Sequence, residues 1–196
     1  MKEFLMVFLV ALFSDNYVMT KFFGTEPIIT GSDDTHSSFG VGISVTLVLV
    51  LSTAIVWPIY TLLLLPFNLT YFNILIFVLV ALAVGKCVKI VTKMASSKTY
   101  EMLTPYFPVI TINSLVFGLS FVNTAEGFGF AKSVVNSFGA GIGFFVAILI
   151  FSGIRGRIKE SHISKSFSGV PVTLVAAGIT ALAFSGFSGV VTNIFG

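Results

Sequence analysis

Two groups of polar side chains interrupt long apolar runs of this sequence, in "LFSDNYVMTKFFGTEP" at 12–27 and in "LTPYFPVITINSLVFG" at 103–118. Their oxygen-bearing members include Asp15, Asn16, Glu26, Thr111, Asn113 and Ser114. Carboxylate, amide and hydroxyl oxygens bind hard cations, and carboxylates also carry protons. Charged groups are costly inside an apolar span, so their presence there favours a functional role. We therefore take all of these residues except Ser114 as candidates for proton or cation coupling.

Each charged residue of the first group also has a plainer interpretation, which the sequence leaves open. Asp15 could pair with Asn16 or with a backbone amide and only orient its helix. Glu26 could be a loop residue close to water. Lys21 could extend its amine to the membrane surface.

The remaining motifs do not predict catalysis or metal binding. The glycines of "GVG" at 40–42 and "GAGIG" at 139–143 follow no strand and carry no phosphate-binding lysine, so they indicate close helix packing. His36 and His162 lie in predicted loops without a second ligand in motif spacing, and Cys87 is the single cysteine. We expect no catalytic residue in this chain and no metal held by it alone.

The composition is that of an integral membrane protein. Of the 196 residues 56% are hydrophobic and only 10% are charged, whereas about a quarter of a soluble domain is charged. The net charge of +3 does not suggest nucleic-acid binding. A span needs about 20 apolar residues. The apolar runs lie near 3–23, 41–65, 72–94, 103–122, 134–154 and 170–192.

Backbone groups in lipid must bond internally, so these runs predict six transmembrane helices in one membrane domain, residues 1–196. The basic residues of two connections are Lys86, Lys89, Lys93, Lys98, Arg155, Arg157, Lys159 and Lys165. The opposite face has only Lys2 and Lys132. Because cytoplasmic loops carry the excess of Lys and Arg, we expect both termini outside the plasma membrane (an inner membrane, where the cell has two) and the loops 24–40, 94–102 and 154–169 in the cytoplasm.

The chain also repeats itself: "SSFGVGISVTLVLV" at 37–50 resembles "NSFGAGIGFFVAIL" at 136–149. Each stretch opens a span, the second and the fifth, and three spans per half would give the halves opposite orientation. The sequence thus predicts two inverted three-helix repeats, about 1–98 and 99–196, with the site between broken helices. The two polar groups would interrupt the first and fourth helices and meet around Glu26 and Ser114.

The chain resembles the RnfA and NqrE family of six-span subunits over most of its length. The likeness is carried by "DNYVMTKFFG", "LPFNLTYFNILIFVLV", "YFPVITINSLVFG", "GIRGRI" and "SFSGVPVTLVAAGITALAFSGFSG". It implies the inverted repeat, outside termini and a non-catalytic subunit of an Rnf-type or Nqr-type complex that couples electron transfer to sodium or proton translocation. The implied partners are a homologous six-span subunit similar to RnfE or NqrD, other subunits carrying flavin and iron–sulfur centres, and membrane lipid.

The resemblance also implies an iron–sulfur cluster, shared with the sister subunit, with two cysteines coming from each. This sequence has Glu26 and Ser114 at the two cysteine positions, and such clusters are normally held by four cysteines. Two further departures add to this: Asp15 replaces the first of the family's paired asparagines, and Gly156 replaces an acidic residue. We expect neither Glu26 nor Ser114 to ligate a cluster, and no cofactor bound by this chain alone.

Three functions remain compatible with these residues. The chain could be a working Rnf-type subunit whose partner holds the metal alone, or through which electrons cross without a metal. It could be a divergent paralogue that uses Asp15 and Glu26 for an ion or another small ligand. It could be a substrate-binding component similar to those of vitamin transporters, although the motifs favour the first two.

Overall fold

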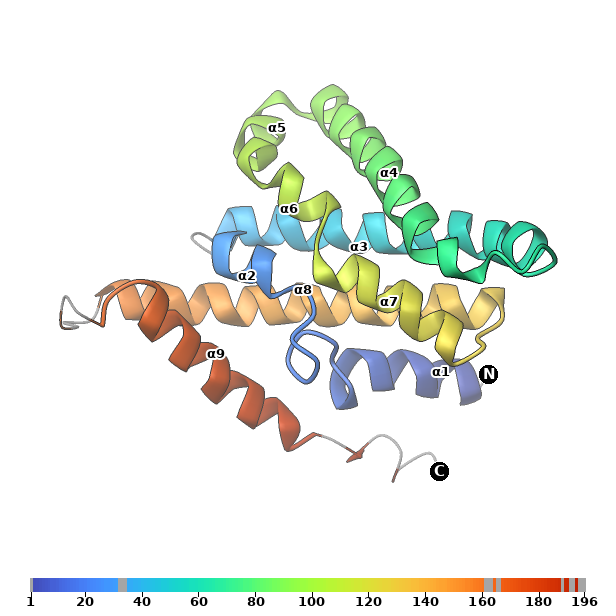
Figure 1. Ribbon diagram of the computed structural model, residues 1–196. Coiled ribbons are helices and arrows are strands. Elements are labelled where there is room, and N and C mark those ends of the chain that lie inside the picture. The colour runs from blue at the N-terminus through green and yellow to red at the C-terminus, as the bar shows by residue number, and fades with distance from the viewer. Residues whose placement is uncertain are drawn as a thin grey trace.

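The structure is a computed structural model that describes residues 2–31, 35–160, 164, 167–187, 189–190 and 193; of residues 30, 31, 159 and 160 it describes the backbone (Figure 1). His162 and Lys165 lie outside the described residues. Within these ranges all the secondary structure is helical, and no strand occurs. The α-helices are α1 (Lys2–Leu9), α2 (Thr25–Gly31), α3 (Thr35–Ile59), α4 (Asn73–Ala95), α5 (Ser97–Leu103), α6 (Phe107–Thr111), α7 (Ser114–Ala125), α8 (Phe130–Glu160) and α9 (Val170–Ser185). Short π or 3-10 turns are η1 (Val10–Ser14), η2 (Tyr60–Leu64), η3 (Thr70–Phe72) and η4 (Thr104–Tyr106).

Within the described residues, four stretches are long and apolar enough to cross a membrane, which confirms the prediction of an all-helical membrane protein. They are Thr35–Leu64, Thr70–Ala95, Ser97–Ala125 and Phe130–Ile158. The predicted sixth span corresponds to α9, a shorter apolar helix of 16 residues. Of the predicted first span, 3–23, only the part up to Ser14 is helical, in α1 and η1, and the separate helix α2 begins beyond it at Thr25.

Helical structure is interrupted at both places where polar residues cluster. In the first segment η1 ends at Ser14 and α2 begins at Thr25. In the fourth, α6 ends at Thr111 and α7 begins at Ser114. Pro105 and Pro108 do not make the second interruption themselves. Each occupies the first or second position of a short helix, where a missing N–H costs little, and the chain leaves the helix only at Ile112.

The centre of the molecule is the pair α3 and α8, which run side by side through the middle of Figure 1. Glycines allow this approach: a Cβ on Gly42 would collide with the Phe145 ring, and one on Gly141 would lie 2.6 Å from Thr46 Cγ2. Gly139 serves the packing of α1, because a Cβ there would lie 2.8 Å from the backbone oxygen of Phe8. Small residues thus bring helix backbones together, as is typical of membrane helices.

Helix α9 makes few contacts with the rest of the chain. Its only residues that are buried are Thr173 and Thr180, and its large apolar side chains such as Leu174 and Leu182 are exposed. In a bilayer an apolar helix surface of this kind is solvated by lipid or by another subunit.

The glycine contacts predict opposite effects of the same substitution at two places in α8. Gly139→Ala should destabilise the protein by about 1–3 kcal/mol, because the new Cβ meets backbone and cannot be accommodated by a rotamer change. Gly153→Ala should be neutral or stabilise by about 0.4–1 kcal/mol, because a Cβ at Gly153 meets nothing within 4 Å. Thermal unfolding of both variants in one detergent measures the difference, and equal melting temperatures would contradict the packing described here.

Candidate functional site

The first interruption is organised by Asn16, whose side chain is fully buried. Its amide nitrogen donates to Leu12 O at 3.0 Å and to Gly143 O at 3.2 Å. Its Oδ1 accepts from the backbone N–H groups of Val18 at 3.0 Å and Met19 at 3.2 Å. One side chain therefore satisfies the carbonyl end of the preceding helix and the N–H groups that follow, and ties both to α8.

The second interruption is organised in the same way by Asn113, which is the N-cap of α7. Its amide nitrogen donates to Val109 O at 3.1 Å and Ile110 O at 3.3 Å, at the end of α6. Its Oδ1 accepts from the N–H of Val116 at 3.0 Å, which is the usual bond of a helix N-cap. Asn16 and Asn113 thus bridge a broken helix in equivalent fashion, one in each half of the chain.

Ser114 connects the two interruptions across 90 residues of sequence. Its Oγ accepts from the N–H of Gly24 at 2.8 Å and donates to Glu26 Oε2 at 2.9 Å. Gly24 has a φ of 74°, and a Cβ there would lie 3.0 Å from Leu115 Cβ, so glycine permits this close approach. The structure therefore brings together Glu26 and Ser114, the two positions that sequence reasoning placed at the centre of the site.

The remaining candidate residues are placed differently. Asp15 is exposed at the end of η1, and Glu26 is exposed in the first turn of α2, so in this chain they do not form a buried carboxylate pair. Thr111 is buried and donates to Phe107 O at 2.9 Å. Lys21 is exposed with its amine 4.8 Å from the centre of the Tyr17 ring, a cation–π contact.

The donors at Glu26 and Ser114 do not fit an iron–sulfur cluster. Such a cluster needs thiolates, and these positions provide a carboxylate and a hydroxyl that already bond each other. Cys87 lies exposed on α4, a helix that contributes neither position. Within the described residues no three His, Cys, Asp or Glu side chains are grouped closely enough to hold a metal ion.

A buried series of hydrogen-bonded side chains, which the sequence reasoning missed, leads away from the first interruption. The Tyr17 hydroxyl donates to Asn136 Oδ1 at 3.2 Å, and the Asn136 amide donates to Asn123 Oδ1 at 2.7 Å. The Asn123 amide reaches Ser137 Oγ at 3.5 Å, and Ser137 Oγ lies 2.7 Å from Thr53 Oγ1. A signal was present, since asparagines are costly inside apolar spans and need partners there.

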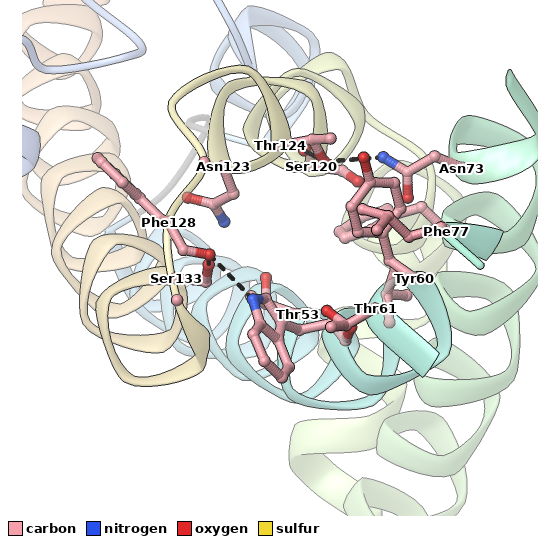
Figure 2. A pocket seen from close by; sticks show the side chains of 15 residues that line it. Thr53, Tyr60, Thr61, Asn73, Phe77, Ser120, Asn123, Thr124, Phe128 and Ser133 are labelled. Atoms are coloured by element: carbon pink, nitrogen blue, oxygen red, sulfur yellow. Dashed lines mark hydrogen bonds between the residues drawn. The ribbon is translucent and has the colours of Figure 1, made fainter. Parts of the chain in front are cut away.

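This polar series ends at a cavity of about 270 Å³ between α3, η2, α4, α7 and α8 (Figure 2). Thr53, Asn73, Asn123 and Thr124 line it, together with aromatic side chains that include Trp57. The Trp57 indole N–H donates to Phe128 O at 2.9 Å and joins α3 to the loop before α8. The cavity lies at the end of the bundle where α7 ends and α4 and α8 begin.

The comparisons with known proteins agree over nearly the whole chain. Residues 4–191 match the model of a family described as Rnf-Nqr subunit, membrane protein. The chain is 37% identical over 193 residues to the A subunit of the ion-translocating oxidoreductase complex of Azoarcus sp. (strain BH72), with 98% of this chain and 100% of that protein covered. It is 35% identical over 179 residues to the A subunit of the Na(+)-translocating ferredoxin:NAD(+) oxidoreductase complex of Acetobacterium woodii, with 91% and 93% covered. It is 33% identical over 192 residues to the A subunit of the proton-translocating ferredoxin:NAD(+) oxidoreductase complex of Clostridium ljungdahlii, with 98% and 100% covered.

The hydrogen bonds of Asn16 predict a structural cost that its exposed neighbour does not share. Asn16→Ala should destabilise the protein by about 2–3 kcal/mol, because it leaves buried backbone carbonyl and N–H groups without partners. Asp15→Ala, the matched control, should change stability by less than about 0.5 kcal/mol, as is usual for an exposed position. Melting temperatures in detergent test this, and an Asn16→Ala variant as stable as Asp15→Ala would show that the amide is not needed to hold the broken helix.

Proposed function

This chain belongs to the Rnf-Nqr family of membrane subunits, and we propose that it is the A subunit of an Rnf-type complex that couples electron transfer to sodium or proton translocation. The observation that carries the proposal is the end-to-end match to relatives named as the A subunits of such complexes. The interruptions at Asn16 and Asn113 support it, since broken helices at membrane depth are typical of ion-coupled membrane proteins. On its own the chain is a non-catalytic subunit.

For its topology we propose six spans in two inverted repeats, with both termini outside and loops 24–40, 94–102 and 154–169 in the cytoplasm. The similar backbone hydrogen bonds of Asn16 and Asn113, each to groups before and after an interruption, support a duplicated three-helix unit. An ion pair between Glu3 and Lys132 supports a common side for the N-terminus and the connection before α8. The basic residues lie at the C-terminal ends of α4 and α8. They favour the cytoplasm for the side of the membrane at which these C-terminal ends lie.

The partners that we propose are a homologous six-span subunit, together with the flavin-carrying and iron–sulfur subunits of the complex. Co-purification with a tagged copy of this chain from its native membrane tests the proposal. Recovery of a second six-span subunit with flavin-carrying subunits is the expected result. Recovery of an ATPase pair instead would identify a transporter component, and recovery of neither would favour a divergent paralogue that acts alone.

Within this complex the pair Glu26 and Ser114 should contribute no ligand to a cluster. Ser114→Ala and Glu26→Gln should leave the iron content and the EPR spectrum of the purified complex unchanged, because neither oxygen replaces a thiolate. Cys87→Ser serves as the control for the one thiol of the chain and should also change nothing. Loss of a stoichiometric cluster with Ser114→Ala would contradict the prediction.

Ion coupling is a second role that we propose for the interrupted helices, with Asp15, Asn16, Glu26, Thr111 and Asn113 as its residues. The observation that favours it is the hydrogen bond from Ser114 to Glu26, which places a carboxylate at the junction of both interruptions. Carboxylates beside interrupted membrane helices are typical of ion and proton pathways.

The charge of Glu26 is then required for transport. Glu26→Gln and Asp15→Asn should lower the ions moved per electron, because an amide holds a cation less tightly than a carboxylate; a loss of about 1.4 kcal/mol weakens the cation affinity about tenfold. Glu101→Gln, at an exposed position of α5, is the matched control and should transport normally. Ion uptake by proteoliposomes that contain the complex measures the ratio. Normal coupling in both site variants would exclude these carboxylates from the ion path.

A further inference from the structure

A groove of about 610 Å³ lies between α3, α4 and α5, and none of its lining residues belongs to either helix interruption. Along α3 the groove extends from His36 to Leu51, which at 1.5 Å per residue is a length of about 22 Å. A bilayer with its headgroups is about 40–45 Å thick, so one leaflet is about as thick as this groove is long. The groove therefore has the length of one lipid molecule and is shorter than a complete transmembrane helix.

The groove is polar at one end and apolar at the other. His36, Ser96 and Thr99 line the end at which α3 begins and α4 is connected to α5. Leu47 and Leu51 line the opposite end, and both are nearly half exposed. An accessible apolar surface with a polar rim is typical of a binding site. A phospholipid has the same order of groups, with a polar head followed by an acyl chain.

The polar end of the groove offers hydrogen-bond donors. Ser96 Oγ accepts from the backbone N–H of Thr99 at 3.3 Å and from Thr99 Oγ1 at 3.1 Å, so the Ser96 hydroxyl proton remains to be donated. Lys98 lies between these two residues in sequence and is exposed, and among the described residues no carboxylate pairs with its amine. Glu101 of the same helix does not line the groove. A hydroxyl donor beside a free ammonium suits a phosphate.

We propose that this groove binds one anionic phospholipid, with its phosphate at Ser96 and Lys98 and one acyl chain along α3 toward Leu51. The acyl chain covers the exposed apolar side chains of α3 and α4 and joins the short helix α5 to them. The proposed topology places the polar end in the cytoplasmic leaflet, where anionic lipids attract basic residues. The choice of leaflet rests on the proposed function, but the affinity of the groove for a lipid does not.

Cys87 provides one measurement, because it is the single cysteine of the chain, is exposed and lines the groove. The full chain in detergent, freed of lipid, is titrated with phosphatidylglycerol. Native mass spectrometry counts the bound lipid, and the alkylation rate of Cys87 by N-ethylmaleimide reports whether the thiol is covered. The expected result is one retained lipid molecule per chain and a saturable decrease in the alkylation rate.

The phosphate contact is tested at Lys98. Lys98→Gln should weaken phosphatidylglycerol binding about fivefold, the usual effect of one lysine on an anionic lipid. Lys2→Gln is the control, because Lys2 is also exposed but lies in α1 and does not line the groove. Phosphatidylcholine, which carries no net charge, should bind more weakly than phosphatidylglycerol. Equal binding of the two lipids would overturn the assignment to an anionic lipid.

The acyl-chain contact is tested by filling the groove. Leu47→Trp should prevent retention of the lipid, because the larger side chain occupies the space of the acyl chain. Ile55→Trp is the matched control on the same helix: Ile55 is 45% exposed and Leu47 is 47% exposed, but Ile55 does not line the groove. If Leu47→Trp does not fold, Val91→Trp fills the same groove from an exposed position of α4.

A folded chain that retains no phosphatidylglycerol and whose Cys87 is alkylated at an unchanged rate overturns the proposal. Equal lipid retention in folded Leu47→Trp and Ile55→Trp variants overturns it as well. Co-purification that Leu47→Trp abolishes, without any change in lipid retention, would assign the groove to a helix of another subunit. Because lipid binding is measured on the isolated chain, its failure leaves the proposed complex intact, and failure to co-purify with Rnf-type subunits leaves the lipid site intact.

Discussion

Backbone N–H and C=O groups find no partner in lipid, so each interruption of a helix at membrane depth has to supply partners of its own. In this protein Asn16 and Asn113 do so. Each amide group donates to carbonyls that the ending helix leaves open and accepts from N–H groups that follow. An asparagine is suited to this because a single planar group carries two donors and an acceptor. The positions of Glu26 and Ser114 depend on these two junctions.

The sequence was sufficient to predict an all-helical membrane protein, close packing through glycines and a family relationship. The apolar runs and the positions of the glycines carry that information locally. The meeting of the two polar groups depended on the repeat, and Ser114 does contact Glu26. The roles within each group were harder to assign. Asn16 and Asn113 were considered as ion-coupling residues, and in the structure both bond backbone groups on either side of an interruption, Asn113 as the N-cap of α7.

The cavity could not be predicted from the sequence because its residues come from segments that are far apart along the chain. Asn73 opens α4, Thr53 lies in α3, and Thr124 lies near the end of α7. Each of these residues alone is an ordinary interruption of an apolar run. They line one cavity only because α3 packs against α8 and α4 packs against α7. Pro105 and Pro108 do not locate the interruption either, since a proline tolerated in a first turn looks the same in sequence as one that breaks a helix.

The double contact of Ser114 has a mechanical consequence. Because its Oγ holds both the Gly24 N–H and the Glu26 carboxylate, α2 cannot tilt away from α7 without breaking two hydrogen bonds at once. Separating the start of α2 from α7 therefore costs both of these hydrogen bonds, which contribute about 1–3 kcal/mol each when a charged group takes part. Near the other end of α2 the carbonyl of Ile29 accepts from Arg155 of α8, so this short helix is anchored at both ends, to α7 at one and to α8 at the other.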